Sequence, residues 1–171
     1  KEFATTTKRE FNDARSYEFS LFSEFASKVE AIEYSIKNLK DWMKSERRKT
    51  KKPMNFLGGR SEVRYFPKGV VGIISPWNLP FGLTVSPLTS ALAAGNRALL
   101  KPSEHVPETA ALFAKVVPKY FSTDEVAVVT GGQDISQQFA ELPFDHLLFT
   151  GSTHVGAKVM QAASKNLVPL T

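Results

Sequence analysis

The sequence predicts an α/β protein in which a doubly wound, mostly parallel, Rossmann-like sheet follows an N-terminal helical segment. From residue 62 onward, short apolar runs alternate with segments of helical pattern, which is typical of repeated strand–helix–strand units. The runs GVVGII at 69–74 and VAVV at 126–129 contain no polar residue. Such runs indicate parallel strands that helices cover on both faces. We therefore expect a helical segment at 1–52 and an α/β unit with an incomplete sheet at 53–171.

The N-terminal segment contains the pattern of one long amphipathic helix. Its apolar residues are spaced alternately three and four positions apart, which predicts a single apolar stripe. The stripe consists of Phe22, Phe25, Val29, Ile32, Ile36, Leu39 and Met43. Three heptads permit a coiled coil, but the large aromatic side chains favour packing against a neighbouring domain. Pro53 and the pair Gly58-Gly59 then predict a linker or turn.

Five strands and four helices are expected in the α/β unit. The predicted strands are Glu62–Phe66, Gly69–Ser75, Ala98–Lys101, Val126–Thr130 and His146–Thr150. The predicted helices are Gly82–Ala94, Pro107–Phe121, Ile135–Glu141 and Thr153–Ser164. Gly95 suits a left-handed helix stop, and Pro107 followed by Glu108 suits a first helical turn. This order of elements is that of a doubly wound sheet.

Composition excludes several kinds of site. The 171 residues include no cysteine, which rules out disulfides and cysteine-bound metals and fits a reducing, cytoplasmic compartment. The histidines at 105, 146 and 154 lack the spacing of metal ligands, so no metal site is expected. No stretch approaches the roughly 18–20 continuous apolar residues of a membrane span. The chain begins at Lys1 rather than Met and stops in an apolar run, from which we expect a fragment of a longer protein.

The net charge of +5 is unevenly distributed, because residues 1–52 carry 13 Lys and Arg against 9 Asp and Glu. The excess lies chiefly in KSERRKTKK at 44–52, which permits a nucleic-acid or acidic-membrane patch. No aromatic residue interleaves this cluster, and Lys and Arg suit a helix C-terminus. A solvated helix end is therefore favoured, and no nucleic-acid partner is expected.

Polar or glycine-rich residues follow four of the predicted strands. They are Ser75-Pro76-Trp77-Asn78, Lys101-Pro102-Ser103-Glu104, Thr130-Gly131-Gly132 and Thr150-Gly151-Ser152-Thr153. The carboxyl ends of parallel strands meet at one edge of a sheet, and ligands bind there. We therefore expect these four turns to surround one ligand site.

The last of these turns carries part of a phosphate-binding pattern. Gly151 and Gly156 are spaced as the outer glycines of G-x-G-x-x-G, with Thr153 in place of the middle glycine. The free N–H groups of a helix N-terminus and the Ser152 hydroxyl suit a phosphate. A glycine at a strand–helix turn is at least as often structural, so both interpretations stay open.

The second and third turns also allow two interpretations. Lys101 and Glu104 provide a cation and an acceptor for the two hydroxyls of a ribose, or they form a surface ion pair. The pair Gly131-Gly132 permits the close approach of a flat adenine, or it makes a plain turn.

The first turn contains an isolated amide between two prolines. Asn78 is either an Asx-turn residue before Pro80 or a hydrogen-bond donor at the mouth of an active site. Trp77 beside it suits a protein core as well as a cofactor contact.

Taken together, these segments resemble the cofactor domain of the aldehyde dehydrogenase superfamily. The resemblance is carried, in order, by PKGVVGIISPWNLPF, ALAAGNRALLKPSE, VVTGG and FDHLLFTGSTHVG, and it runs from about residue 28 to the end. SIKNLKDWMKSERRK followed by FLGGRSEVRYFPKGVVGII is similar to the short-tailed branch that includes coniferyl aldehyde dehydrogenases. The resemblance implies that 53–171 is the first part of an NAD(P)-binding domain, truncated at its C-terminal end.

The resemblance also implies roles for individual residues. Asn78 would donate its side-chain N–H to the oxyanion that forms as a cysteine thiolate adds to an aldehyde carbonyl. Lys101 and Glu104 would hold the adenine ribose, and the residues from Gly151 to Gly156, with Ser152 foremost, would meet the pyrophosphate. The other expected cofactor contacts are Ile74, Ser75, Pro76 and Trp77 along the adenosine and nicotinamide-ribose path, and Gly131 and Gly132 near the adenine.

The implied activity is oxidation of an aldehyde to a carboxylic acid with NAD or NADP, the aldehyde being aromatic, such as coniferyl aldehyde, or fatty. The family's nucleophilic cysteine and its deacylating glutamate, in an E-L-G-G-K-like segment, do not occur in these residues. We therefore expect this polypeptide alone to be inactive, and the full-length enzyme to be a homodimer or tetramer. The alternative is a cysteine-free pseudoenzyme that binds a nucleotide or serves as an interaction module.

Overall fold

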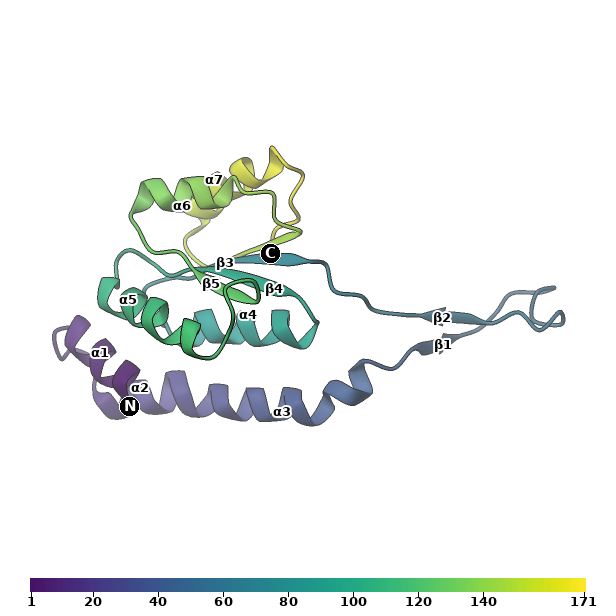
Figure 1. The fold of residues 1–171 in the computed structure, drawn as a ribbon, viewed down its shortest axis with the longest axis horizontal. Helices are drawn as coiled ribbons and strands as arrows, with labels where there is room; N and C mark the ends of the chain where they lie inside the picture. Colours follow the sequence, from purple (N-terminus) through teal and green to yellow (C-terminus); the bar gives the residue numbers. More distant parts are fainter.

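A four-stranded parallel sheet lies at the centre of the protein, whose residues 1–171 are all described by a computed structural model (Figure 1). The strands are β3 (Val70–Ile74), β4 (Arg97–Lys101), β5 (Val126–Val128) and β6 (His146–Phe149). Their spatial order is β5-β4-β3-β6, with every neighbouring pair parallel. The chain order therefore reverses between β3 and β6, which confirms the predicted doubly wound α/β fold.

Helices cover both faces of this sheet (Figure 1). α4 (Gly82–Ala93) and α5 (Pro107–Val116) lie on one face, and α6 (Gln133–Ala140) and α7 (Thr153–Ser164) on the other. Because side chains alternate along a strand, Ile73 packs in the core with α4 and α5, and Ile74 packs in the core with α6 and α7. Burial of each such side chain contributes about 1.5–3 kcal/mol. The two cores explain why β3 has no polar position.

Close packing and backbone conformation require glycine at two positions of this unit. A Cβ atom on Gly72 would lie 2.6 Å from the ring of Phe144, so only glycine allows this ring to pack on β3. Gly95 follows α4 with φ of +78°, which confirms the predicted left-handed helix stop.

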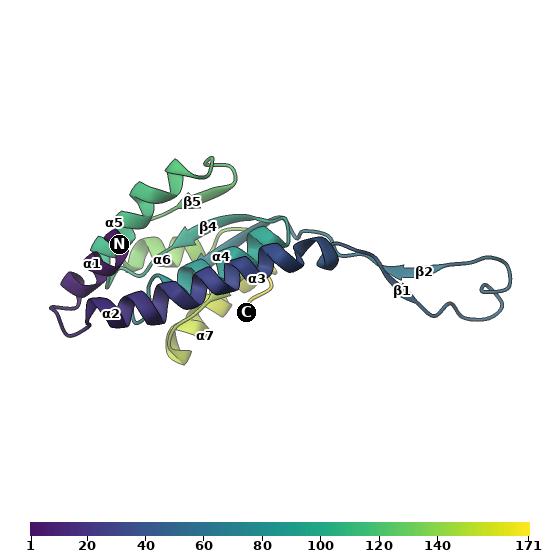
Figure 2. The same ribbon diagram turned by 90° about the horizontal axis from the view of Figure 1, so that it is seen from below.

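The N-terminal residues form α1 (Glu2–Glu10), α2 (Tyr17–Ser20), the π-helical turn η1 (Leu21–Ala26) and α3 (Ser27–Trp42), the last three as one continuous helix. α3 runs alongside α4 (Figure 2), and α1 packs against α5. The predicted apolar stripe divides into two rows. Phe25, Ile32 and Leu39 are partly covered by the body of the protein, whereas Phe22, Val29, Ile36 and Met43 are exposed.

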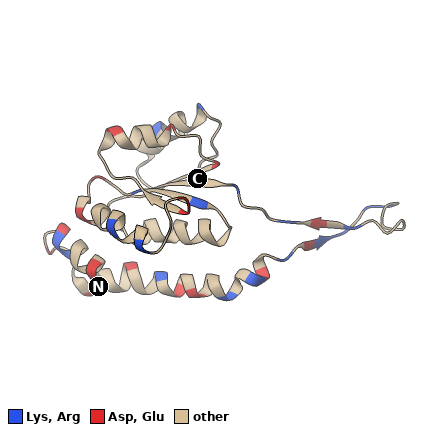
Figure 3. Cartoon of the chain, viewed as in Figure 1, with Lys and Arg blue, Asp and Glu red and all other residues tan.

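A two-stranded antiparallel hairpin of β1 (Glu46–Arg48) and β2 (Ser61–Val63) projects from the body (Figures 1 and 2). The expected helix end over 44–52 is therefore wrong, because the helix stops at Trp42 and Arg47 pairs across the hairpin with Glu62. Opposite charges on facing strands stabilise such a pair. Acidic and basic residues are intermixed along α3, whereas the basic excess lies in the hairpin segment, where residues 44–64 include eight Lys and Arg against two Glu (Figure 3).

The remaining elements agree with the predicted helices and strands to within a few residues, with three exceptions. The strand predicted at Glu62–Phe66 as part of the α/β unit lies in the hairpin as β2 and not in the parallel sheet. The predicted helix Pro107–Phe121 ends at Val116 and continues only as the short 3₁₀ turn η2 (Val117–Lys119), because Pro118 cannot continue an α-helix. α1 was not predicted. None of the helices combines the length and the apolar character that are needed to cross a bilayer.

Candidate functional site

A cavity of about 660 Å³ opens at the carboxyl edge of the sheet, between the ends of β3, β4 and β6 and the helices α6 and α7. Its size is that of a small-molecule site. Eight of the predicted site residues line it, namely Ile74, Ser75, Pro76, Trp77, Lys101, Glu104, Gly151 and Ser152. Four do not, namely Asn78, Gly131, Gly132 and Gly156. The cavity thus lies at the carboxyl edge of the sheet, where the sequence predicted a ligand site.

A second, smaller cavity of about 480 Å³ lies between α3, α4 and η2. Its lining is hydrophobic except for Ser35 and Thr89. A ligand site normally contains a few convergent polar groups that fix the orientation of the ligand. The polar cavity at the sheet edge is therefore the better candidate for chemistry.

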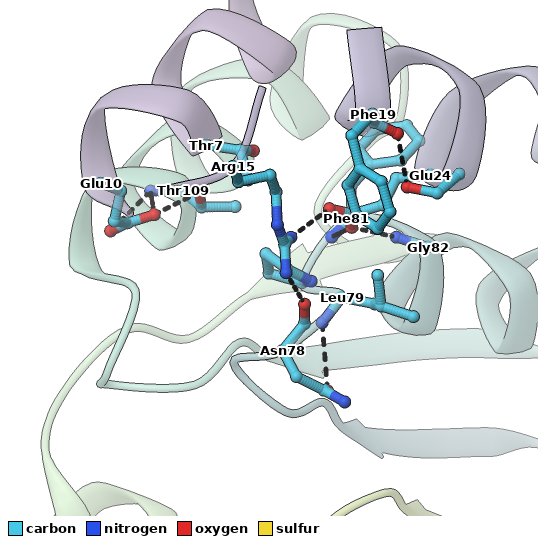
Figure 4. A network of polar contacts seen from close by, with 12 residues as sticks. Thr7, Glu10, Arg15, Phe19, Glu24, Asn78, Leu79, Phe81, Gly82 and Thr109 are labelled. Atoms are coloured by element: carbon cyan, nitrogen blue, oxygen red, sulfur yellow. Dashed lines mark hydrogen bonds and ion pairs between the residues drawn. The ribbon is translucent and has the colours of Figure 1, made fainter. Parts of the chain in front are cut away.

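The loop between β3 and α4 carries Asn78 next to the cavity-lining Trp77. The Asn78 Oδ1 atom accepts a hydrogen bond of 3.0 Å from the Leu79 N–H, which identifies this atom as the oxygen of the amide. The Nδ2 atom has no hydrogen-bond partner in the protein, and the side chain points away from the N-terminal helices (Figure 4). The amide therefore retains its two N–H donors for a ligand.

Both ends of this loop are anchored. Thr84 in the first turn of α4 places its hydroxyl 2.6 Å from the Ser75 hydroxyl and 2.6 Å from the Pro80 carbonyl oxygen. Ser75 and Thr84 are buried. Hydrogen bonds between buried groups hold the strand end and the helix start in one geometry.

Lys101 ends β4 inside the cavity wall, and its side chain is 1% exposed. The ammonium group donates to the Pro102 carbonyl oxygen at 2.9 Å and lies 3.6 Å from the Glu104 carboxylate. Burial lowers the pKa of Lys101, and the negative charge of Glu104 opposes this effect. An ammonium group has three donors, and the protein provides a hydrogen-bond acceptor at short distance for one of them. Lys101 can therefore donate to a polar ligand in the cavity.

The turn between β6 and α7 presents a helix N-terminus to the cavity. The Ser152 hydroxyl accepts from the Val155 N–H at 3.4 Å and so caps the helix. A Cβ atom on Gly151 would lie 2.4 Å from the Phe149 ring, and one on Gly156 would lie 3.3 Å from it. Both glycines thus have a packing reason, and the N–H groups of the cavity-lining Gly151 and Ser152 have no hydrogen-bond partner in the protein, so they are available to a ligand.

The predicted adenine contacts lie at the start of α6. Gly131 has φ of +147° and approaches Ile135 closely, so that a Cβ atom would lie 2.6 Å from the Ile135 side chain. Gly132 is the N-cap residue of α6. Their role toward a ligand stays a prediction.

Sequence reasoning missed several polar side chains of the cavity. They are His105, Gln133, Ser136, Gln137, Glu141, Lys158, Gln161 and Lys165. The Ser136 hydroxyl lies 3.5 Å from Glu104, and Lys165 forms an ion pair of 2.6 Å with Glu141, whereas Lys158 has no acidic partner. All of them except His105 lie on α6 or α7 or at the C-cap of one of these helices, and helical spacing from the predicted turns is the signal that would have found them.

The arrangement defines a class of protein, a doubly wound α/β domain with a polar cavity at the carboxyl edge of its sheet and a free side-chain amide next to it. The sequence matches the aldehyde dehydrogenase family over residues 4–171, and the chain belongs to that family. It is similar to a probable coniferyl aldehyde dehydrogenase of Caulobacter vibrioides, with 43% identity over 99% of this chain and 35% of that protein. A probable coniferyl aldehyde dehydrogenase of Pseudomonas aeruginosa is 47% identical over 95% of this chain and 34% of that protein. The chain thus spans about a third of the length of these relatives.

Solved structures show the same fold. The substrate-bound AldH of Staphylococcus aureus superposes with a TM-score of 0.87 at 33% identity, over 99% of this chain and 40% of that chain. The NAD+ complex of an aldehyde dehydrogenase from Bacillus cereus gives a TM-score of 0.83 at 25% identity, over 99% of this chain and 34% of that chain.

Proposed function

We propose that this chain is the cofactor-binding part of an NAD(P)-dependent aldehyde dehydrogenase, with Asn78 as the oxyanion donor of the full-length enzyme. The observation that supports the proposal is the hydrogen bonding of the Asn78 side chain. Its amide oxygen is engaged by Leu79, its Nδ2 group is free, and it stands beside the cavity wall. An oriented donor of this kind, aimed at developing negative charge, accelerates acyl chemistry about 10²–10³-fold.

The cavity residues fit NAD or NADP. Lys101 and Glu104 would hold the adenine ribose, because a buried ammonium with spare donors and a partly exposed carboxylate lie 3.6 Å apart at one wall. Ser152 and the N–H groups from Gly151 to His154 would face the pyrophosphate, because those of Val155 and Gly156 already donate to Ser152. The chemistry that NAD(P)+ supplies when bound is acceptance of a hydride. The relative from Bacillus cereus was solved with NAD+, which supports this assignment.

The chain holds no cysteine, so the nucleophile would belong to the part of the full-length enzyme that the relatives have in addition. These 171 residues alone would then bind cofactor without oxidising an aldehyde. The same absence favours a second candidate, a cysteine-free nucleotide-binding or interaction module without catalysis. The coding sequence after Thr171 distinguishes them, because the first proposal requires an E-L-G-G-K-like segment and a later cysteine.

The substrate proposed is an aromatic aldehyde of the coniferyl type or a fatty aldehyde, on the strength of the similarity to coniferyl aldehyde dehydrogenases. The chain would divide into a helical segment at 1–52 and an incomplete cofactor domain at 53–171, and a cysteine-free chain fits the cytoplasm.

The full-length enzyme would be a homodimer or tetramer, and the hairpin supports this part of the proposal. An isolated two-stranded hairpin is marginally stable in water. The β1–β2 hairpin nevertheless projects from the body with Phe56 and Leu57 exposed at its tip (Figure 1). A neighbouring subunit would cover these side chains.

Substitution of Asn78 tests the proposal. In the full-length enzyme, Asn78→Ala should lower kcat/KM for an aldehyde about 10²–10³-fold, because one oxyanion donor is lost, while the Kd for NAD(P)+ changes little. Asn38→Ala on α3, where the amide donates to the Tyr34 carbonyl oxygen, is the matched control and should leave kcat/KM unchanged. An unchanged kcat/KM in Asn78→Ala would refute the proposed role.

A further inference from the structure

The loop that carries Asn78 is held by two side chains from the N-terminal segment, Arg15 in the turn between α1 and α2 and Glu24 in η1 (Figure 4). We infer that Arg15 and Glu24 are positioning residues that fix the Asn78 amide in its donor geometry. This inference rests on the proposed role of Asn78 and adds to it the residues that set its position. Neither residue lines the cofactor cavity, so neither is expected to touch the cofactor.

Glu24 is a fully buried carboxylate that joins the two segments. It lies in the π-helical turn η1, with a side chain that is 0% exposed. Its Oε2 atom accepts from the N–H groups of Phe81 at 2.8 Å and Gly82 at 3.1 Å, at the start of α4. A carboxylate at a helix N-terminus satisfies free N–H groups and interacts favourably with the helix dipole. Glu24 therefore fixes where α4 begins, four residues after Asn78.

Arg15 connects this carboxylate to Asn78 itself. One guanidinium nitrogen, Nη1, donates to Glu24 Oε1 at 2.8 Å, and the other, Nη2, donates to the backbone carbonyl oxygen of Asn78. The guanidinium carbon lies 4.1 Å from the centre of the Phe11 ring, and the side chain is 13% exposed. A planar group held by an aromatic face and two acceptors has little freedom to move.

The chain brings Arg15 to this place through a tight turn after α1. Asn12 and Asp13 have φ of +49° and +60°, a left-handed conformation that Asn and Asp tolerate better than most residues. Ser16 then caps α2 by accepting from the Phe19 N–H at 3.0 Å. Both features fix the backbone on either side of Arg15.

The geometry at Asn78 follows from these contacts. Its carbonyl oxygen is held toward Arg15 and its Oδ1 toward Leu79 N–H, which leaves Nδ2 as the outward group of the residue. A lysine at position 15 has a single ammonium group and cannot reproduce the fork that reaches both acceptors. Loss of the fork would let the peptide of Asn78 rotate, and a misplacement of about 1 Å in a catalytic group lowers the rate up to about 10²-fold.

A double-mutant cycle distinguishes positioning from general support of the fold. In the full-length enzyme, kcat/KM for an aldehyde is compared for the native protein, Arg15→Lys, Asn78→Ala and the double variant, with the Kd for NAD+ measured for each. If Arg15 acts through Asn78, Arg15→Lys should lower kcat/KM about 10–100-fold in the native background and less than about twofold when Asn78 is already alanine. The Kd for NAD+ should stay within about twofold in all four proteins, because Arg15 does not line the cavity.

Two further variants distinguish a positioning role of Arg15 from a general effect of arginine substitution or a failure to fold. Arg9→Lys alters a comparable arginine–carboxylate pair, with the exposed Glu108, and should leave kcat/KM unchanged. If Arg15→Lys does not fold, Phe11→Leu, which removes the ring beneath the guanidinium, replaces it in the same cycle. Equal factors in both backgrounds, or no effect of either variant in the native background, would overturn the inference. An Asn78→Ala protein with full activity would instead refute the proposed role of Asn78.

Discussion

The two loops at the carboxyl edge of neighbouring strands β3 and β6 are held in different ways. The β3–α4 loop, which carries Asn78, is anchored by side chains that lie about 60 positions earlier in the sequence, since the Arg15–Asn78 and Glu24–Phe81 hydrogen bonds span 63 and 57 residues. The β6–α7 turn is held by local contacts, the cap by Ser152 and the packing of Gly151 on Phe149.

This difference corresponds to the work that each loop would do. Backbone N–H groups at a helix N-terminus bind a phosphate wherever the helix starts, so a short glycine turn suffices for β6–α7. A side-chain donor must point at one atom of the substrate, and a single amide has rotational freedom that only surrounding contacts remove. The donor loop therefore needs anchors from outside its own strand–helix unit.

Substitution of Glu24 should have the largest effect, because this residue anchors the β3–α4 loop from a distant part of the chain. Glu24→Gln should lower the free energy of unfolding by about 3–5 kcal/mol, because removal of one partner leaves the Arg15 charge buried without its counterion. The measurement is the thermal midpoint of the variant. Glu2→Gln, which breaks the exposed pair with Lys115, is the control and should change the midpoint little. Similar midpoints for the two variants would show that the donor loop does not depend on this anchor.

A substitution in the local turn should have a smaller effect. Gly151→Ala places a Cβ atom 2.4 Å from the Phe149 ring and should cost about 1–3 kcal/mol by overpacking. Phe149→Leu in the same chain should recover much of this cost by making room. The losses of stability are measured by thermal unfolding. If the losses of the two single variants simply add in the double variant, the turn is not held by this contact.

Substitution of Lys101 tests whether its buried charge lowers the stability of the folded protein. Burial lowers the pKa of Lys101, so the folded protein bears a cost for its charge that is full at low and neutral pH and disappears as the pH rises toward the unfolded value of 10.5. Lys101→Met should therefore raise the thermal midpoint at pH 7, with an advantage that shrinks in alkaline buffer. A lower midpoint at pH 7 would contradict this.

The smallest effect is expected at the opposite edge of the sheet, away from both loops. Partial burial, with a smaller effect of the nearby Lys68 charge, lowers the pKa of His146 below 6.5. The unfolded chain therefore takes up the proton first, and stability falls as the pH drops through 6.5 toward the lowered pKa. His146→Gln should flatten the dependence of the thermal midpoint on pH between about 7 and 5. An equally steep dependence in the variant would show that other groups cause it.

Local patterns predicted the sheet and most of the cavity, because these depend on contacts between segments with distinct periodicity. The runs around Val71 and Ala127 are apolar on both faces, and the polar turns that follow the strands come together by the topology alone.

Long-range contacts were not predictable in the same way. Glu24 lies in an amphipathic helix among other charged residues, and its complete burial depends on Phe81 and Gly82, which are remote in sequence. Likewise, β1 consists of charged residues that form a strand only because Ser61–Val63 pairs with them. Pairing and burial of polar residues follow from tertiary structure rather than from propensity.

The central claim is that the cavity at the carboxyl edge of the sheet binds NAD(P) through Lys101. Calorimetric titration of NAD+ and NADP+ into the full-length enzyme and into its Lys101→Met variant tests it most directly. The native enzyme should bind one cofactor per chain, and the variant should bind it at least about tenfold more weakly, because a ribose would lose a charged hydrogen-bond donor. Equal affinities in the two folded proteins would contradict it.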